Sequence, residues 1–411
     1  MTDNKKVLMF PIKLILGFLV FTELFIWLGP INYHIKNSLV LLLYLLILNV
    51  ALYWGYKLGL RKSRVSYFHL SDTWLHVLLI AGLIATFRYL IMVWNNHGIS
   101  VTWENLIFGI LNPGDAYLAE SEHGYQGSFL DLIILNPLRW AAIPLGVAFW
   151  KRLSNLYKGF LITTILLTLA CNLGVGIRKG LFDIIIITFF VLISRNTSFI
   201  TESTKKRKLV IIGVVSIVLF LFYFVFSIAS RKGDDLLFLS TGVVQNSTRE
   251  FYNLLPSWLV YSLSSIDSYL CQGYDALSRA LEMGIRPIVP FGDSWVAIYY
   301  SNKFFGYDPL PDTYLAALET YGIDPRINWH TMYLWLANQY TFIGVPFVII
   351  WVGYCLATTW RSAVSCKNDL VYPLFSYFLI MCFYMYANNQ VFSDAAISFW
   401  IWFFSYHLFK K

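Results

Sequence analysis

Residues 209–229 read LVIIGVVSIVLFLFYFVFSIA and give way at Ser230 to the charged run Arg231-Lys232-Gly233-Asp234-Asp235. An apolar run of about 20 residues is long enough to cross the roughly 30 Å hydrocarbon core of a bilayer as a helix. The chain then stays amphipathic through residue 330, and a second apolar run begins at Met332. The segment between the two runs is too rich in aromatic and aliphatic residues for disorder. It is therefore predicted to be a folded cap beside the membrane.

The composition places the whole chain among membrane proteins. Its 411 residues are 58% hydrophobic and 13% charged, and the mean hydropathy is +0.60, which excludes an ordinary soluble protein of this length. The apolar runs are continuous rather than alternating, so they predict helices and not a barrel. We expect an all-α polytopic protein with about ten transmembrane helices. The runs lie at 7–28, 39–60, 73–94, 129–150, 159–175, 181–194, 209–229, 332–356, 371–386 and 392–409.

Lysines and arginines gather in every second connection between the runs and at the two ends. These cations are Lys5, Lys6, Lys57, Arg61, Lys62, Arg64, Lys151, Arg152, Lys158, Arg195, Lys205, Lys206, Arg207, Lys208, Arg361, Lys367, Lys410 and Lys411. The positive-inside rule then places both termini in the cytoplasm and the cap on the other side. The formal net charge of +8 follows largely from this pattern, so no nucleic-acid partner is expected.

Three regions follow from these runs. Residues 1–229 are predicted to form an N-terminal bundle of about seven spans with a smaller outer loop at 95–128, residues 230–330 a large helical extracytoplasmic loop, and residues 331–411 about three further spans. Within the cap, residues 251–263 and 268–281 have apolar side chains at helical spacing and predict two short helices, with Pro256 bending or delimiting the first. The five cysteines are scattered, which predicts neither a disulfide framework nor a metal site, and we expect no cofactor.

Two cations lie between the fifth and sixth runs, where the topology leaves almost no room for a loop. Arg178 and Lys179 stand between glycines at the expected outer membrane face. Guanidinium binds phosphate oxygens in a bidentate way and lysine adds a mobile charge, so the pair could clamp an anion. The alternative is ordinary snorkelling to the headgroups. We favour the clamp for Arg178, and Asp183, about one turn beyond Lys179, could pair with either cation.

The cap is rich in arginine. Its arginines are Arg231, Arg249, Arg279, Arg286 and Arg326. Arginine's planar fork suits a phosphate or carbohydrate site better than lysine does. Arg231 is a candidate catalytic residue, and Arg249, Arg286 and Arg326 are candidate substrate-binding residues together with Lys179.

A histidine marks the point where the cap returns to the membrane. His330 lies among polar and aromatic residues that include Tyr333, a further candidate for substrate binding. The ordinary pKa of histidine suits proton transfer near neutral pH, which makes His330 a candidate general base. A histidine at a helix start is equally often a cap or an interface residue.

Cations and a base at the outer membrane boundary favour a donor that already resides in the membrane. A lipid diphosphate-linked sugar meets this requirement, because the arginines would stabilise the departing diphosphate and His330 would accept the proton of the attacking hydroxyl. Nucleotide-sugar chemistry fits poorly, since the cytoplasmic segments contain only scattered acids and no paired carboxylates to carry a metal.

Short motifs resemble a known family. They are Gly176-Ile177-Arg178-Lys179-Gly180, residues 269–281, and Trp329-His330-Thr331-Met332-Tyr333 leading to Tyr340-Thr341-Phe342-Ile343-Gly344. With the whole topology, they resemble the Wzy-type O-antigen or capsule repeat-unit polymerases, which belong with the C-type glycosyltransferases. The family's usual loop-to-helix signature ends with an acidic residue, as in Asp-Phe-Gly, and Thr341-Phe342-Ile343-Gly344 departs from that form. Arg231 with Gly242 matches an arginine–glycine spacing found in some members.

The resemblance implies a reaction and a location. The expected activity joins two undecaprenyl-diphosphate-linked oligosaccharide repeat units, one as donor and one as acceptor, on the periplasmic face of the bacterial inner membrane. Membrane lipids are expected partners, and a chain-length regulator and a flippase are partners by analogy with the family. Three alternatives remain open: an O-antigen ligase that transfers glycan to lipid A core, a lipid-oligosaccharide transporter, and a structural scaffold.

Overall fold

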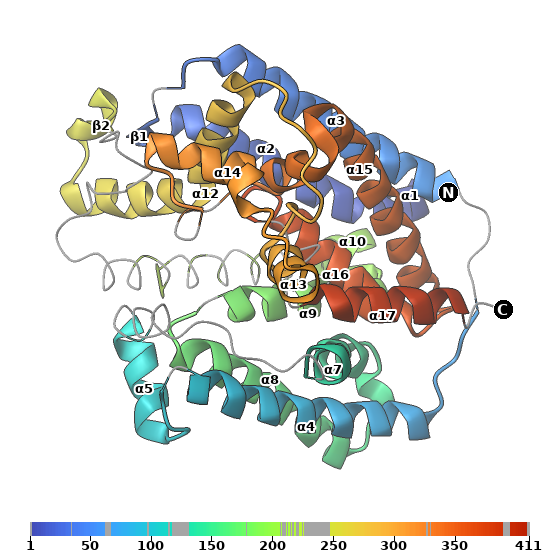
Figure 1. Ribbon diagram of the computed structural model, residues 1–411. Helices are drawn as coiled ribbons and strands as arrows, with labels where there is room; N and C mark the ends of the chain where they lie inside the picture. Colours follow the sequence, from blue (N-terminus) through green and yellow to red (C-terminus); the bar gives the residue numbers. More distant parts are fainter. Residues whose placement is uncertain are drawn as a thin grey trace.

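The computed structural model describes residues 2–33, 35–61, 67–96, 98–113, 116, 131–177, 179–205, 207, 247–325, 328, 330–388 and 395–408, with scattered positions between 211 and 225. These residues are mostly helical (Figure 1). The helices are α1 (Thr2–Leu8), α2 (Phe10–Leu28), α3 (Ser38–Arg61), α4 (Asp72–Asn96), α5 (Trp103–Leu111), α7 (Asn136–Ala148), α8 (Asn155–Gly174), α9 (Lys179–Arg195), α10 (Ser198–Thr201), α12 (Ser257–Glu282), α13 (Trp295–Phe305), α14 (Tyr314–Ala317), α15 (Met332–Ser365), α16 (Val371–Phe383) and α17 (Ala395–Leu408).

Short elements complete the described chain. A π-helical turn (Asp131–Leu135) precedes α7, and 3₁₀ turns lie at Trp150–Arg152, Glu250–Leu254, Leu310–Asp312 and Leu318–Tyr321. Strands β1 (Ile31–Asn32) and β2 (Ser247–Thr248) pair antiparallel, with Ile31 opposite Thr248. Of the predicted smaller outer loop at 95–128, the structure describes α5 and its flanks, while residues 97, 114, 115 and 117–128 lie outside the described part.

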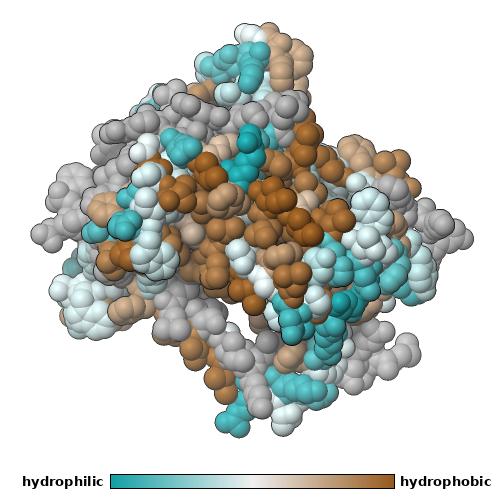
Figure 2. All heavy atoms as spheres, turned by 90° about the horizontal axis from the view of Figure 1, so that it is seen from below, coloured by the Kyte–Doolittle hydropathy of each residue, from teal (hydrophilic) through white to brown (hydrophobic). Residues whose placement is uncertain are grey.

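Within the described part of the chain, five helices are long and apolar enough to cross a membrane. They are α2, α3, α4 over Asp72–Asn95, α8 and α15, and the apolar segments Ile133–Ala148 and Val371–Phe383 are shorter. Figure 2 views the underside of Figure 1, where α4 and α8 lie, and shows a broad hydrophobic area there. Many large apolar side chains on these helices are exposed, Ile84 and Leu166 among them, as expected for a lipid-facing surface. The chain is therefore a helical membrane protein, while the full set of ten spans stays a prediction.

Glycines allow α3 and α15 to pack closely. A side chain at Gly55 would collide with the backbone carbonyl of Ile350, and one at Gly353 with the carbonyl of Leu52. Small residues at a helix–helix contact are the usual way to bring backbones together inside a bilayer, where burial of apolar surface against lipid contributes little.

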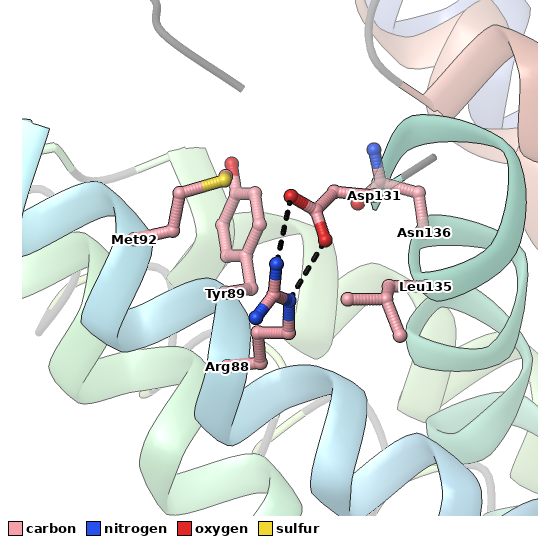
Figure 3. A pocket seen from close by; sticks show the side chains of 6 residues that line it. All are labelled: Arg88, Tyr89, Met92, Asp131, Leu135 and Asn136. Carbon is pink, nitrogen blue, oxygen red and sulfur yellow. Dashed lines mark hydrogen bonds and ion pairs between the residues drawn. The ribbon is translucent and has the colours of Figure 1, made fainter. Parts of the chain in front are cut away.

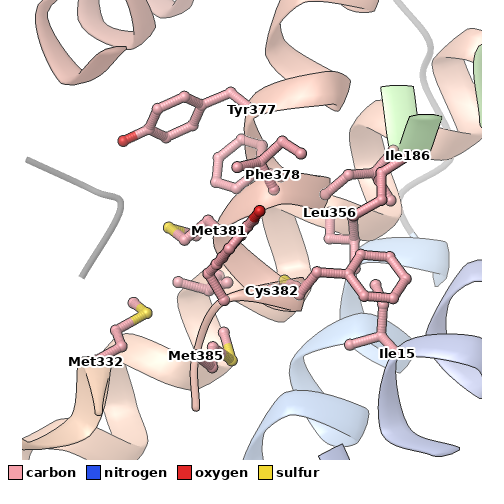
Figure 4. Packing of buried hydrophobic residues seen from close by; sticks show 14 of the residues in the cluster. Ile15, Ile186, Met332, Leu356, Tyr377, Phe378, Met381, Cys382 and Met385 are labelled. Atoms are coloured by element: carbon pink, nitrogen blue, oxygen red, sulfur yellow. The ribbon is translucent and has the colours of Figure 1, made fainter. Parts of the chain in front are cut away.

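Helix α16 lies at the centre of the molecule. All of its residues are buried, as expected for a helix that is apolar on every side. Figure 4 shows its Cys382 and the adjacent Met385 packed among residues from several helices, including Ile15 of α2, Ile186 of α9 and Leu356 of α15. Helices α9, α16 and α17 lie between an upper group containing α2, α3 and α15 and a lower group containing α4, α7 and α8 (Figure 1).

The two ends of the described chain lie on the same side. Helix α1 and the end of α17 are at the right of Figure 1, whereas β1, β2 and the start of α12 are at the left. Turns at the right-hand side are joined by ion pairs: Arg152 contacts Asp72 at 2.6 Å and Asp369 at 3.7 Å. Two ends on the same side imply that the chain crosses the membrane an even number of times. The assignment of the two sides to cytoplasm and periplasm stays a prediction.

The expectation of two short cap helices was wrong. A single helix, α12, runs from Ser257 to Glu282, and Pro256 delimits its start. The predicted gap is helical because its polar residues pack against the end of α2 and β1 rather than forming a turn. Asp267 is fully buried and accepts a hydrogen bond from the backbone N–H of Ile31 at 2.8 Å.

Helix α15 is interrupted near its start. Thr341 has φ 56° and ψ 164°, a conformation that side-chain-bearing residues rarely adopt. Before this break, the Asn338 amide donates to the carbonyl of Gly292 at 2.9 Å and accepts from the backbone N–H of Tyr314 at 2.8 Å. The first part of α15, residues 332–340, therefore packs with the cap, and the part after Thr341 is still about 36 Å long, enough to span a bilayer.

Candidate functional site

Three distant segments of the chain meet beside the start of α15. A Cβ atom at Gly273 of α12 would lie 2.6 Å from the carbonyl oxygen of Tyr386 and 3.1 Å from the backbone nitrogen of Thr331. The backbone N–H of Met332 donates to the carbonyl of Met385 at 2.9 Å. We call this meeting point of α12, the start of α15 and the segment after α16 the junction. Glycine is required at 273 because any side chain would separate these backbones.

His330 lies at the junction, immediately before the N-cap residue Thr331. Its side chain is 1% exposed, and its Nε2 atom has no hydrogen-bond partner among the described residues. The ring bonds to the backbone of Asn328, whose N–H already donates to the carbonyl of Asp324, so the acceptor for His330 is the Asn328 carbonyl. The donor must then be Nδ1, which leaves the lone pair on Nε2.

The environment keeps His330 neutral. Burial lowers its pKa from 6.5 to about 4, and the bond to Asn328 and the charge of Asp324 offset this only in part. Trp335 packs beside the ring, with centroids 6.3 Å apart, and itself contacts Trp295 at 5.6 Å. A fixed, neutral imidazole with an unused lone pair can accept a proton, and its lowered pKa makes it a weaker base than an exposed histidine.

Lys179 also reaches the junction. Its ammonium donates to the carboxylate of Asp183 at 2.6 Å and lies 4.9 Å from the ring centroid of Tyr384. The ring of Tyr384 is stacked on Tyr386 at 6.4 Å, and the backbone of Tyr386 contacts Gly273. The predicted pairing of Asp183 is confirmed for Lys179. Because this pairing orients the ammonium, Lys179 is a better-defined cation than its sequence context indicated.

Tyr333 is part of the packed interior of the junction. Its side chain is 1% exposed, and its hydroxyl lies 3.8 Å from the sulfur of Met385. The structure therefore places it beside His330 and the segment after α16, with its hydroxyl directed at protein atoms.

The two described cap arginines of the predicted site lie elsewhere. Arg249 donates from Nε to the carbonyl of Gly29 at 2.9 Å and from Nη2 to that of Ile26 at 3.0 Å, so it caps the carboxyl end of α2. The guanidinium of Arg286 lies 5.8 Å from the ring centroid of Tyr314. No contact between these arginines and His330 is present among the residues that the structure describes.

Three of the predicted site residues, Arg178, Arg231 and Arg326, lie outside the described residues. Within the described ranges, no group of three or more His, Cys, Asp or Glu side chains is placed to hold a metal ion.

Comparisons with protein-family models, with curated proteins and with solved structures found no match to this chain. The assignment of a function therefore depends on the junction itself and on the sequence resemblance.

The sequence did not single out Gly273, Tyr384, Tyr386 or Trp335. A signal for the two tyrosines was present, because polar residues 388–390 follow them where the predicted topology leaves little room for a loop. Gly273 had no such signal, since a glycine in a helix is common and only the two backbones that approach it give it a role.

Proposed function

We propose that this protein is a glycosyltransferase that polymerises undecaprenyl-diphosphate-linked oligosaccharide repeat units at the periplasmic face of a bacterial inner membrane. The observation that carries the proposal is the free Nε2 lone pair of a buried, neutral His330 at the junction. The resemblance of residues 329–333 and 176–180 to repeat-unit polymerases supports the same reaction.

In the proposed reaction His330 acts as the general base. An acceptor sugar hydroxyl attacks the anomeric carbon of the donor glycan, and Nε2 takes the hydroxyl proton. The new bond joins the acceptor oxygen to the anomeric carbon, while the bond from that carbon to the phosphate oxygen breaks. The lipid diphosphate leaves with the electron pair of that bond, so the two sides balance without an oxidant or a nucleotide.

Cations stabilise the departing diphosphate in this proposal. Lys179 is held by Asp183 at the junction, and Arg178 is its neighbour in sequence. Asp183 orients the Lys179 ammonium and also offsets its charge, so Arg178 would supply the net positive charge that stabilises the developing negative charge. Arg231 and Arg326, which lie outside the described residues, remain candidates for the same role, whereas Arg249 caps α2 and Arg286 lies against Tyr314.

Reconstitution tests the activity. The purified protein in liposomes receives an undecaprenyl-diphosphate-linked oligosaccharide from its own source, and the products are separated by size. A ladder with repeat-unit spacing is expected. A product that forms only after addition of lipid A core would instead identify a ligase, and redistribution of unchanged substrate across the bilayer would identify a transporter.

A further inference from the structure

A second polar site lies on the seam between α4 and α7, apart from the junction. Figure 3 shows a small pocket lined by Arg88, Tyr89 and Met92 of α4 and by Asp131, Leu135 and Asn136. Arg88 donates to both carboxylate oxygens of Asp131, at 2.8 and 3.3 Å, and 62% of its side chain is exposed. These two charges neutralise one another at the mouth of the pocket.

Arg139 of α7 adds a cation that the pocket's carboxylate does not neutralise. Its guanidinium carbon lies 3.6 Å from the ring centroid of Tyr89, one of the pocket residues. Among the residues that the structure describes, its buried Nε atom has no hydrogen-bond acceptor and no carboxylate lies within ion-pair distance of its guanidinium. Tyr89 holds the guanidinium by a cation–π contact, which orients the fork.

The depth of this cation restricts what can bind it. Tyr89 precedes Asn95, the end of the candidate span in α4, by six residues, which is about 9 Å along a helix. An arginine at that depth is costly unless it meets an anion or reaches the headgroup layer. The anion available at the boundary of a bilayer is a lipid phosphate, and the guanidinium fork fits phosphate oxygens in a bidentate way.

We propose that the α4–α7 seam is a binding site for the phosphate group of an anionic membrane lipid, with Arg139 as its principal ligand and Tyr89 as the platform that orients Arg139. The net charge of Arg88, Arg139 and Asp131 is one positive charge, which matches a phosphodiester headgroup. The proposal does not depend on the polymerase assignment, because it uses no residue of the junction.

Lipid retention measured by native mass spectrometry tests this site. The purified full-length protein is titrated with phosphatidylglycerol and, separately, with phosphatidylcholine. We expect preferential retention of phosphatidylglycerol, with a loss of about tenfold in affinity in Arg139→Gln and a smaller loss in Arg139→Lys, which keeps the charge without the fork. Tyr89→Phe keeps the stacking ring and should retain wild-type affinity.

Two comparisons keep the test decisive. Arg279→Gln is the matched control, because Arg279 is paired with Asp275 in the cap and should not change lipid retention. Inorganic phosphate is added as a competitor: displacement of the lipid at millimolar concentration would show that the site takes free phosphate as well, whereas no displacement would assign it to lipid alone. Equal phosphatidylglycerol affinity in wild type and in Arg139→Gln, with Arg139→Lys as a second folded variant, would overturn the proposal.

Discussion

At the scale of single residues, the state of His330 depends on where its two ring nitrogens point. Nδ1 is used by the backbone of Asn328, and Nε2 is free and buried. A satisfied core histidine would use both nitrogens or would be partly solvated. An unused acceptor in the interior costs stability, which is typical of groups kept for function rather than for folding.

The lowered pKa of His330 makes the free energy of unfolding depend on pH. Folding holds the imidazole neutral down to about pH 4, whereas the unfolded chain protonates it near pH 6.5. The unfolded state therefore binds more protons between these values, so stability is complete above pH 6.5 and falls as the pH decreases toward 4, by up to about 3 kcal/mol.

Melting curves in detergent from pH 7.5 to 4.5 measure this loss. The wild type should lose more stability than His330→Gln over that interval, because glutamine does not titrate. Parallel profiles for the two proteins would contradict the buried, neutral state assigned to His330.

Gly273 permits a second prediction at this scale. Gly273→Leu should open the junction, because a side chain there collides with the backbones of Tyr386 and Thr331. A double variant, Tyr269→Cys with Ala387→Cys, places one cysteine in α12 and one in the segment after α16. Its cross-linking yield would report the distance between these two segments. We expect the yield to fall in Gly273→Leu and to stay unchanged in Gly159→Ala, a helical glycine of α8 where nothing lies within 4 Å of the added atom.

At the scale of elements, the first part of α15 connects the cap to the membrane-spanning helices. Asn338 is the central residue of this connection, because its amide bonds both to Gly292 and to the first residue of α14. Its backbone carbonyl also accepts from Val289 at 2.8 Å. Residues 289–292, which precede α13, are therefore fixed to α15 by the buried side chain of Asn338 and by its backbone carbonyl.

Replacement of Asn338 should loosen residues 289–292 and the start of α14. Asn338→Ala leaves the carbonyl of Gly292 and the N–H of Tyr314 without a partner, at a cost of about 2 kcal/mol or more. Hydrogen exchange over residues 285–325 is expected to speed up. Gln339→Ala is the matched control, because the exposed amide of Gln339 contacts only the neighbouring Tyr340 hydroxyl among the described residues, and equal exchange in both variants would contradict the assignment.

The break at Thr341 should store strain. A residue with a side chain at φ 56° and ψ 164° costs about 1–3 kcal/mol, and glycine adopts this conformation freely. We expect Thr341→Gly to raise the melting temperature in detergent, since the relief exceeds the added backbone entropy of the unfolded chain. A lower melting temperature would show that α15 is not interrupted in solution.

At the scale of the whole molecule, hydropathy was sufficient for the helical membrane class and for where the long apolar helices lie. The Lys179–Asp183 pair was also predictable, because residues four apart in a helix face one another. The long helix α12 was not, because its Ser264-Ser265 segment resembles a turn until Asp267 is seen to bond with β1. The break at Thr341 had a local signal that the sequence analysis did not use: Pro346 cannot donate a hydrogen bond to the carbonyl of Phe342, which disfavours a regular helix at this point.

The site was predictable only in its local parts. His330 and Lys179 were proposed as candidates from their positions at the ends of apolar runs, and their roles stay predictions. The segment containing Tyr384 and Tyr386 reaches the same place through contacts with residues more than fifty positions earlier in the chain, which no local pattern reports. The capping role of Arg249 at α2 was hidden for the same reason.

The most direct test of the account is the single-turnover rate of glycan transfer by His330→Gln, measured in liposomes with the lipid-linked oligosaccharide against His69→Gln. His69 is exposed and lies beside Asp369, far from the junction in sequence, so its loss should leave the rate unchanged. Loss of a general base should lower the rate by about 10²–10⁴-fold in His330→Gln, and the wild-type rate should fall only as the pH approaches about 4. A His330→Gln rate within a few fold of wild type, in correctly folded protein, would show that His330 is not the base.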